Sequence, residues 1–217
     1  MERRTVGVML CLIVIPLPSN RAYAQDESTI GIRIYDVVGI RSAPMDGSHL
    51  RVEAIFRQAG VRVAWRDCRT SAPHSAICDA APLPNEAIVR LLSGAPTFST
   101  DGCGVALVPT IEPAHFISLF VDCIRRAADR LAVREEVVLA GTLAHEIGHL
   151  LLGPQHGFVG LMQAQPRGVD WARATHDGLT FTASESHRLR QALTHGCAVG
   201  CIPERRADPR GPEFDAR

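Results

Sequence analysis

The spacing of apolar residues along the chain separates strand-like from helix-like segments. Alternating, β-branched runs predict strands at residues 30–38, 61–65, 86–92, 105–108 and 115–121. Apolar positions that recur with a helical period predict helices at residues 48–58, 122–131, 134–152 and 181–192. Ser, Ala and Pro dominate residues 69–85, which we therefore expect to form a loop.

The order of these elements predicts the fold class. Strands and one early helix precede a long central helix, which is followed by an irregular segment and a final helix. This order predicts an α+β fold with a single sheet and a helix packed on it. No internal repeat or long linker divides residues 25–202, so we expect them to form one domain, with residues 203–217 as a flexible tail.

The first 24 residues have the organisation of a Sec-type signal peptide. Two arginines precede an apolar run at residues 5–17, and Ala22-Tyr23-Ala24 provides a small-residue cleavage site. The run is too short to span a bilayer comfortably, and no later stretch is long and apolar enough for a membrane helix. The sequence therefore predicts export to the periplasm or the medium, with no membrane attachment after cleavage.

Export changes the interpretation of the cysteines. Loss of Cys11 with the signal peptide leaves six cysteines in the mature chain, which are Cys68, Cys78, Cys103, Cys123, Cys197 and Cys201. An even number in an exported chain favours disulfides over a metal site. We predict pairing between sequence neighbours, because each such pair brackets a loop or adjacent elements.

Composition narrows the function classes. The chain is 46% hydrophobic and 21% charged, which is ordinary for a globular protein. Its 23 basic and 23 acidic residues cancel, so the formal net charge is zero. Nothing in these totals supports nucleic-acid binding, which usually requires a basic surface.

The chemistry of the chain is concentrated in the string His-Glu-Ile-Gly-His at residues 145–149. His145 and His149 are four residues apart, so they lie on one face of the predicted helix. Two imidazoles in this arrangement can bind one Zn²⁺, and Glu146 can take a proton from the water that the ion activates. The spacing therefore predicts a single catalytic zinc ion with Glu146 as the general base.

A catalytic zinc ion needs a third protein ligand, for which the sequence leaves two main candidates. His156 is the first, because Gly153 allows the chain to turn off the helix so that His156 returns to the metal. Glu185 is the second, as an acidic ligand from a later helix. Thr182 and Glu185 also match a capping box, which would give Glu185 a structural role instead. More remote alternatives are His176, Asp177 and His187.

With these residues the sequence resembles the metzincin clan of zinc endopeptidases, whose pattern is His-Glu-x-x-His-x-x-Gly-x-x-His followed by a Met-turn. The present chain has one extra residue between His149 and the glycine, and Gly160-Leu161-Met162 matches the Met-turn. The resemblance implies one twisted mixed sheet, an active-site helix and a C-terminal helix. It further implies that Met162 forms a hydrophobic floor under the histidines. Residues 104–108 would then be the edge strand that holds the peptide, and residues 160–163 would wall the pocket beside the metal.

The chain also resembles, over residues 116–193, a group of secreted bacterial proteins with a HEIGHLLLG run and a downstream Gly-Ile-Met. Residues and resemblance together predict an exported zinc peptidase whose partner is a peptide or protein substrate. One alternative is a non-catalytic zinc-binding module that binds a partner through its cleft. Another is a zinc hydrolase that acts on a non-peptide amide. The presence of Glu146 argues against the binding module, because a purely structural metal site has no use for that carboxylate.

Overall fold

The computed structural model describes residues 28–68, 76–94, 102–108, 116–175 and 178–194. Its strands are β1 (Thr29–Asp36), β2 (Arg62–Asp67), β3 (Glu86–Leu92), β4 (Gly104–Ala106) and β5 (Phe116–Phe120). Its helices are α1 (Ser42–Gln58), α2 (Ala76–Asp79), α3 (Val121–Leu131), α4 (Glu135–Leu152), α5 (Gly168–Ala174) and α6 (Ala183–Thr194).

The strands form one mixed sheet in the order β2-β1-β3-β5-β4. β1 pairs in parallel with both β2 and β3, and β3 pairs in parallel with β5. β4 alone runs antiparallel, along β5. The prediction of an α+β fold with a single mixed sheet is therefore confirmed. β4 lies at one edge of this sheet, so one of its sides has no strand partner in the described structure.

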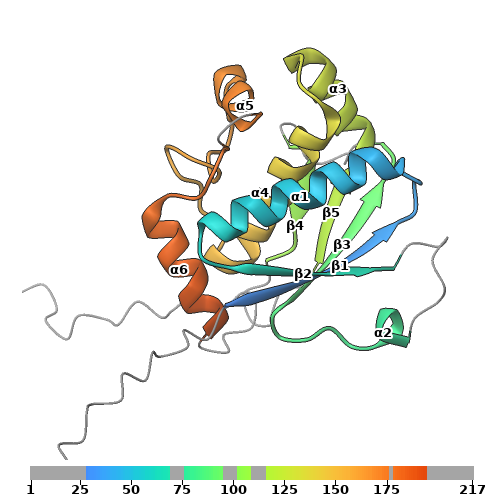
Figure 1. The fold of residues 1–217 in the computed structure, drawn as a ribbon, viewed down its shortest axis with the longest axis vertical. Helices are drawn as coiled ribbons and strands as arrows, with labels where there is room; N and C mark the ends of the chain where they lie inside the picture. The colour runs from blue at the N-terminus through green and yellow to red at the C-terminus, as the bar shows by residue number, and fades with distance from the viewer. Residues whose placement is uncertain (1–27, 69–75, 95–101, 109–115, 176–177, 195–217) are drawn as a thin grey trace, which may run out of the picture.

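Two long helices, α1 and α4, pack against each other over one face of the sheet, whereas α2 lies on the other side (Figure 1). α4 is buried along most of its length because it sits between the sheet, α1, α3 and α6. Leu143 and Ile147 of α4 join Ile32 and Val89 of the inner strands in one apolar core. α4 is thus held rigidly, which is the condition for presenting side chains in a precise geometry.

Several predicted boundaries were wrong near the N-terminus. The first strand ends at Asp36 and not at residue 38, because the Asp36 carboxylate accepts hydrogen bonds from the backbone N–H groups of Val38, Gly39 and Ile40. The first helix begins at residue 42 and not at residue 48. Pro44 is compatible with this earlier start, since backbone N–H groups in the first turn have no partner within a helix.

Later elements also depart from the predictions. The strand expected at 105–108 covers Gly104–Ala106, and the strand expected at 115–121 ends at Phe120 because Val121 already begins α3. The loop expected at 69–85 contains the short helix α2. The sequence pattern missed α5 altogether, since none of its residues is fully buried and it has no apolar period to detect.

Two disulfides join cysteines that neighbour each other in the sequence. Cys68 is bonded to Cys78 and Cys103 to Cys123, as predicted. The third predicted pair, Cys197–Cys201, lies outside the described residues, as do the segments predicted to be a signal peptide and a C-terminal tail. Within the described part of the chain, no helix has the length and apolar character needed to cross a membrane.

Candidate metal centre

α4 places His145 and His149 one turn apart, with their imidazoles side by side. The two Nε2 atoms are 3.0 Å apart, and the ring planes are inclined at 85°. His149 is buried and His145 is half-buried. The helical spacing predicted this pairing, and the burial of α4 removes most of its freedom to rearrange.

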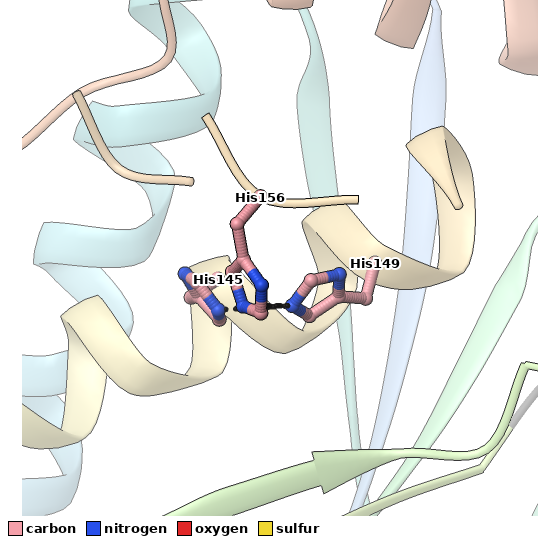
Figure 2. A group of neighbouring side chains, drawn as sticks. All are labelled: His145, His149 and His156. Carbon is pink, nitrogen blue, oxygen red and sulfur yellow. Dashed lines mark hydrogen bonds between the residues drawn. The ribbon is translucent and has the colours of Figure 1, made fainter. Parts of the chain in front are cut away.

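His156 reaches the same point from the segment that follows α4, as Figure 2 shows. The helix ends at Leu152, and Gly153 takes a φ of 92° that side-chain-bearing residues rarely adopt. The chain reverses there and brings Nε2 of His156 to 3.2 Å from Nε2 of His149. A ligand-capable nitrogen of each of the three histidines lies within 4.8 Å of the others.

The outer nitrogens of the two helical histidines fix which atom faces the centre. Nδ1 of His145 lies 2.7 Å from the carbonyl oxygen of Leu161, and Nδ1 of His149 lies 3.1 Å from that of Gly153. A carbonyl oxygen only accepts hydrogen bonds, so each Nδ1 carries the hydrogen and each Nε2 carries a lone pair. Such outer hydrogen bonds are the usual way to orient histidine ligands of a metal.

These facing lone pairs fit a shared cation. Burial lowers the pKa of His145 to about 4, despite its hydrogen bond to Leu161, and burial also lowers the pKa of His149. Both imidazoles are therefore neutral at pH 7, and no proton lies between their Nε2 atoms. Ligands at about 2.0–2.1 Å in a tetrahedron lie about 3.3 Å from each other. The observed separations of 3.0 and 3.2 Å are close to that edge, so the residues fit a zinc ion.

Glu146 lies beside the first histidine and faces the edge strand. Its side chain is 7% exposed, and its carboxylate accepts a hydrogen bond from the backbone N–H of Ala106 in β4. Burial raises the pKa of Glu146 to about 7, and the hydrogen bond from Ala106 only partly opposes this. Without a bound metal ion, a carboxyl group with such a pKa takes up and releases a proton near neutral pH.

β4 can approach Glu146 so closely because residue 104 is glycine. A Cβ at Gly104 would lie 2.7 Å from both Cγ and Oε1 of Glu146. Cys103 and Leu107 on either side pair with β5, through the bonds Phe120 N–H to Cys103 O and Leu107 N–H to Phe116 O. Since hydrogen bonding alternates along an antiparallel strand, Gly104 and Ala106 turn their backbone groups towards the open edge.

Met162 packs directly beneath the helix that carries the histidines. It is 1% exposed, and a Cβ at Gly148 would lie only 2.3 Å from its sulfur. The turn that contains Met162 is tied to the ligand segment by a hydrogen bond of 2.7 Å from Gly157 N–H to Met162 O. The same turn supplies the Leu161 carbonyl to His145, so it supports two of the three histidines.

Glu185, the rival third ligand, has a capping role. Its carboxylate accepts a hydrogen bond of 2.8 Å from the N–H of Thr182, and its own N–H donates to the Thr182 hydroxyl at 3.3 Å. This is the capping box that the sequence had offered as the alternative. The group of potential metal ligands found in the described residues consists of the three histidines and does not include Glu185 or His187. His176 and Asp177 lie outside those residues.

A pocket of about 450 Å³ opens beside His145 and Glu146. α3 and α4 form two of its walls, and the segment that follows Met162 forms another. Trp171 of α5 lines a further side, against Gly141 of α4, and Gly102 and Cys103 line the pocket next to β4. No sequence pattern had indicated Trp171, and a lone tryptophan in a segment without apolar period offered no signal of a role here.

Comparison with known proteins supports the fold. No model of a protein family matches the sequence, and no curated protein matches it either. Among solved structures, archaemetzincin from Methanopyrus kandleri is similar, with a TM-score of 0.52 and 16% sequence identity over 78% of this chain and 98% of that chain. At such low identity the similarity establishes a metzincin-like fold and nothing about activity. The resemblance to secreted HEIGHLLLG proteins has no counterpart among these matches.

Proposed function

We propose that this chain is an exported zinc-dependent peptidase. The convergence of three histidine Nε2 atoms, with Glu146 on the same helix, is the observation that carries the proposal. His145, His149 and His156 would hold one zinc ion. Structural zinc sites are usually closed by four protein ligands, whereas catalytic sites have three and keep a position for water or substrate. Three histidines and an adjacent carboxylate therefore favour catalysis over a purely structural site.

Zinc in this position would supply Lewis acidity, which acidifies water and polarises a carbonyl group. Glu146 would accept the proton of the attacking water and pass it to the nitrogen of the leaving amine. Its burial next to β4 keeps the carboxyl group out of bulk water, and the Ala106 N–H orients it. Proton transfer by a positioned carboxylate contributes about 10²–10⁴-fold to such reactions.

The open edge of β4 supports a peptide as the substrate. An extended peptide can add to a free sheet edge through backbone hydrogen bonds, which requires no particular sequence. Gly104 and Ala106 face that edge and lie against Glu146. Because the Ala106 N–H already donates to Glu146, a peptide would pair with the other backbone groups of these two residues. A peptide paired there would pass directly beside the acid–base group, so its backbone would be aligned with the reacting atoms.

The predicted N-terminal signal and the two disulfides support export. Cys68–Cys78 and Cys103–Cys123 would persist in an oxidising compartment such as the periplasm or the medium. We expect the mature protein to start at Gln25, after the small-residue cleavage site. N-terminal sequencing of the protein recovered from periplasm and culture medium checks both the cleavage point and the compartment.

Cleavage of a peptide library by the purified, disulfide-bonded mature protein tests the peptidase activity. Zinc-loaded wild type should cleave peptides, a chelator should abolish cleavage, and Glu146→Gln should lower the rate by at least about 10²-fold while it still binds zinc. Metal analysis of both proteins verifies loading. If folded, zinc-loaded wild type cleaves nothing, a non-peptide amide substrate or a binding role replaces peptide hydrolysis.

A further inference from the structure

One wall of the pocket beside Glu146 is formed by Trp171, which has no role in the proposed hydrolysis. Trp171 belongs to α5, a helix of seven residues with none of them fully buried. Its indole nevertheless reaches α4, because a Cβ at Gly141 would lie 2.7 Å from Cζ3 and 2.9 Å from Cη2 of the ring. The six-membered ring of Trp171 therefore lies directly over the Gly141 backbone, one turn before His145.

Glycine at this point is costly for the helix. Gly in a helix interior is less favourable than Ala by about 0.8–1.0 kcal/mol, and its neighbours Leu139, Ala140 and Leu143 in α4 are good helix formers. The contact with Trp171 provides the reason for a glycine, since any side chain would displace the indole. Gly141 and Trp171 thus form a matched pair that sets the shape of the pocket wall.

We infer that Trp171 is a specificity-determining residue, which selects substrates with an aromatic side chain next to the cleaved bond. This inference rests on the proposed peptidase function. The pocket opens at His145 and Glu146, so a side chain inside it belongs to a residue at or near the reacting carbonyl. Its volume of about 450 Å³ leaves room for a large ring.

The pocket lining favours an aromatic occupant over a charged one. Leu131 and Trp171 line the pocket with half-buried apolar side chains, and Trp171 offers a ring for stacked or edge-on contact. Val138 and Leu161 lie in the same wall but are almost fully buried. Among the described residues that line the pocket, the one cation is Arg130, which lies in the last turn of α3 and is itself exposed. An acidic substrate side chain that preferred Arg130 is the competing possibility, and the experiments below separate the two.

A binding experiment tests the inference without requiring turnover. Trp65 and Trp171 are the two tryptophans of the chain, and Trp65 lies in β2 at the sheet edge opposite β4. In zinc-loaded Glu146→Gln with Trp65→Phe, the fluorescence therefore reports on Trp171 alone. We expect Ac-Gly-Ala-Phe-Ala-NH2 to change this fluorescence and to bind about tenfold more tightly than the same peptide with Ala in place of Phe. Equal binding of the two peptides would overturn the inference.

A kinetic experiment separates selectivity from simple stability. The library experiment first identifies the bond that the wild type cleaves. Wild type, Trp171→Leu and Gly141→Ala are then compared on peptides that carry Phe, Ala or Glu next to this bond. We expect the ratio of kcat/KM for the Phe peptide to kcat/KM for the Ala peptide to fall about tenfold in both variants. The two substitutions alter the same contact, one from the side of Trp171 and the other from the side of Gly141. Trp171→Phe should restore most of the preference.

The possible failures are distinguishable. If every peptide loses the same factor in Trp171→Leu, Trp171 only anchors α5 and the inference is overturned while the peptidase proposal stands. A wild-type preference for Glu that disappears in Arg130→Gln would also overturn it. If wild type cleaves no peptide but the Phe peptide still binds at Trp171, peptide hydrolysis is wrong and the aromatic site stands.

Discussion

Single atoms decide the chemistry of the three-histidine centre. The carbonyls of Leu161 and Gly153 hold the Nδ1–H groups of His145 and His149, so both Nε2 lone pairs point to one place. Burial keeps these imidazoles neutral by lowering the pKa of His145 and of His149. Neutral, pre-oriented imidazoles can bind a metal ion without first releasing a proton or changing their side-chain rotamer.

The third ligand gives the first prediction at this scale. His156→Ala should weaken zinc binding by more than about 100-fold, beyond what loss of an outer hydrogen-bond partner costs. Glu185→Gln is the matched control, because it removes the rival carboxylate and keeps an acceptor for the Thr182 N–H. Competition with a chromophoric chelator measures both affinities. A large loss in Glu185→Gln with none in His156→Ala would reverse the ligand assignment.

At the scale of elements, α4 and the turn around Met162 interlock. Gly148→Ala places a methyl group where the Met162 sulfur lies, at a separation of 2.3 Å in the present packing. Overpacking of this kind costs about 1–3 kcal/mol, so the variant should unfold at a lower denaturant concentration. Gly47→Ala in α1 is the control, since the three atoms nearest to its Cβ would all belong to the Glu136 side chain, with the closest at 3.0 Å. It should be neutral or stabilising; equal destabilisation of both variants contradicts the interlock.

The Cys103–Cys123 disulfide connects two elements that border the site. Cys103 precedes β4 and lines the pocket, and Cys123 belongs to α3, which forms another wall. Replacing both with serine should lower kcat/KM by about tenfold through loss of β4 alignment while zinc content is retained. The control is the double serine variant at Cys68 and Cys78, near the sheet edge opposite β4.

Either disulfide removal should lower the free energy of unfolding, typically by about 2–4 kcal/mol. Stability alone therefore does not distinguish the two double variants, whereas peptide cleavage at a temperature where both are folded does. If both lose activity to the same extent, the disulfide at β4 contributes general stability and does not align the strand.

For the whole molecule, the buried Glu146 and the half-buried His145 give opposite pH dependences to the stability of the metal-free protein. Glu146 has a raised pKa of about 7, so the folded state holds its proton where the unfolded state has lost it, and stability falls as pH rises through that range. His145 has a lowered pKa of about 4, so its contribution is present above pH 6.5 and is lost as pH falls towards 4.

Glu146→Gln should separate these contributions. In the presence of chelator at pH 8, the variant should be more stable than wild type by up to about 3 kcal/mol, because it no longer buries an ionised carboxylate. The difference should vanish near pH 4, where Glu146 is protonated in both states. Urea denaturation across this pH range measures the effect, and parallel curves for the two proteins would contradict the burial of Glu146 as its cause.

Much of the molecule followed from local patterns. The period of apolar residues predicted α4 and most of the strands, because residues at fixed short spacings along the chain make up one face of a helix or strand. The same periodicity placed His145 and His149 together on one face. Gly153 and the Thr182–Glu185 capping box were also apparent, since turns and caps are formed by residues close in sequence.

Only the tertiary structure could decide the contacts between segments that are distant in the sequence. Whether His156 or Glu185 approached the other histidines depended on how the chain returns after α4. Gly104 against Glu146, Gly148 against Met162 and Gly141 against Trp171 each join elements that only packing brings together. The sequence shows where a glycine lies, but only the fold shows which residue packs into the space that a side chain would otherwise fill. The physical reason is that such contacts depend on the summed packing of the core and leave no periodic signal along the chain.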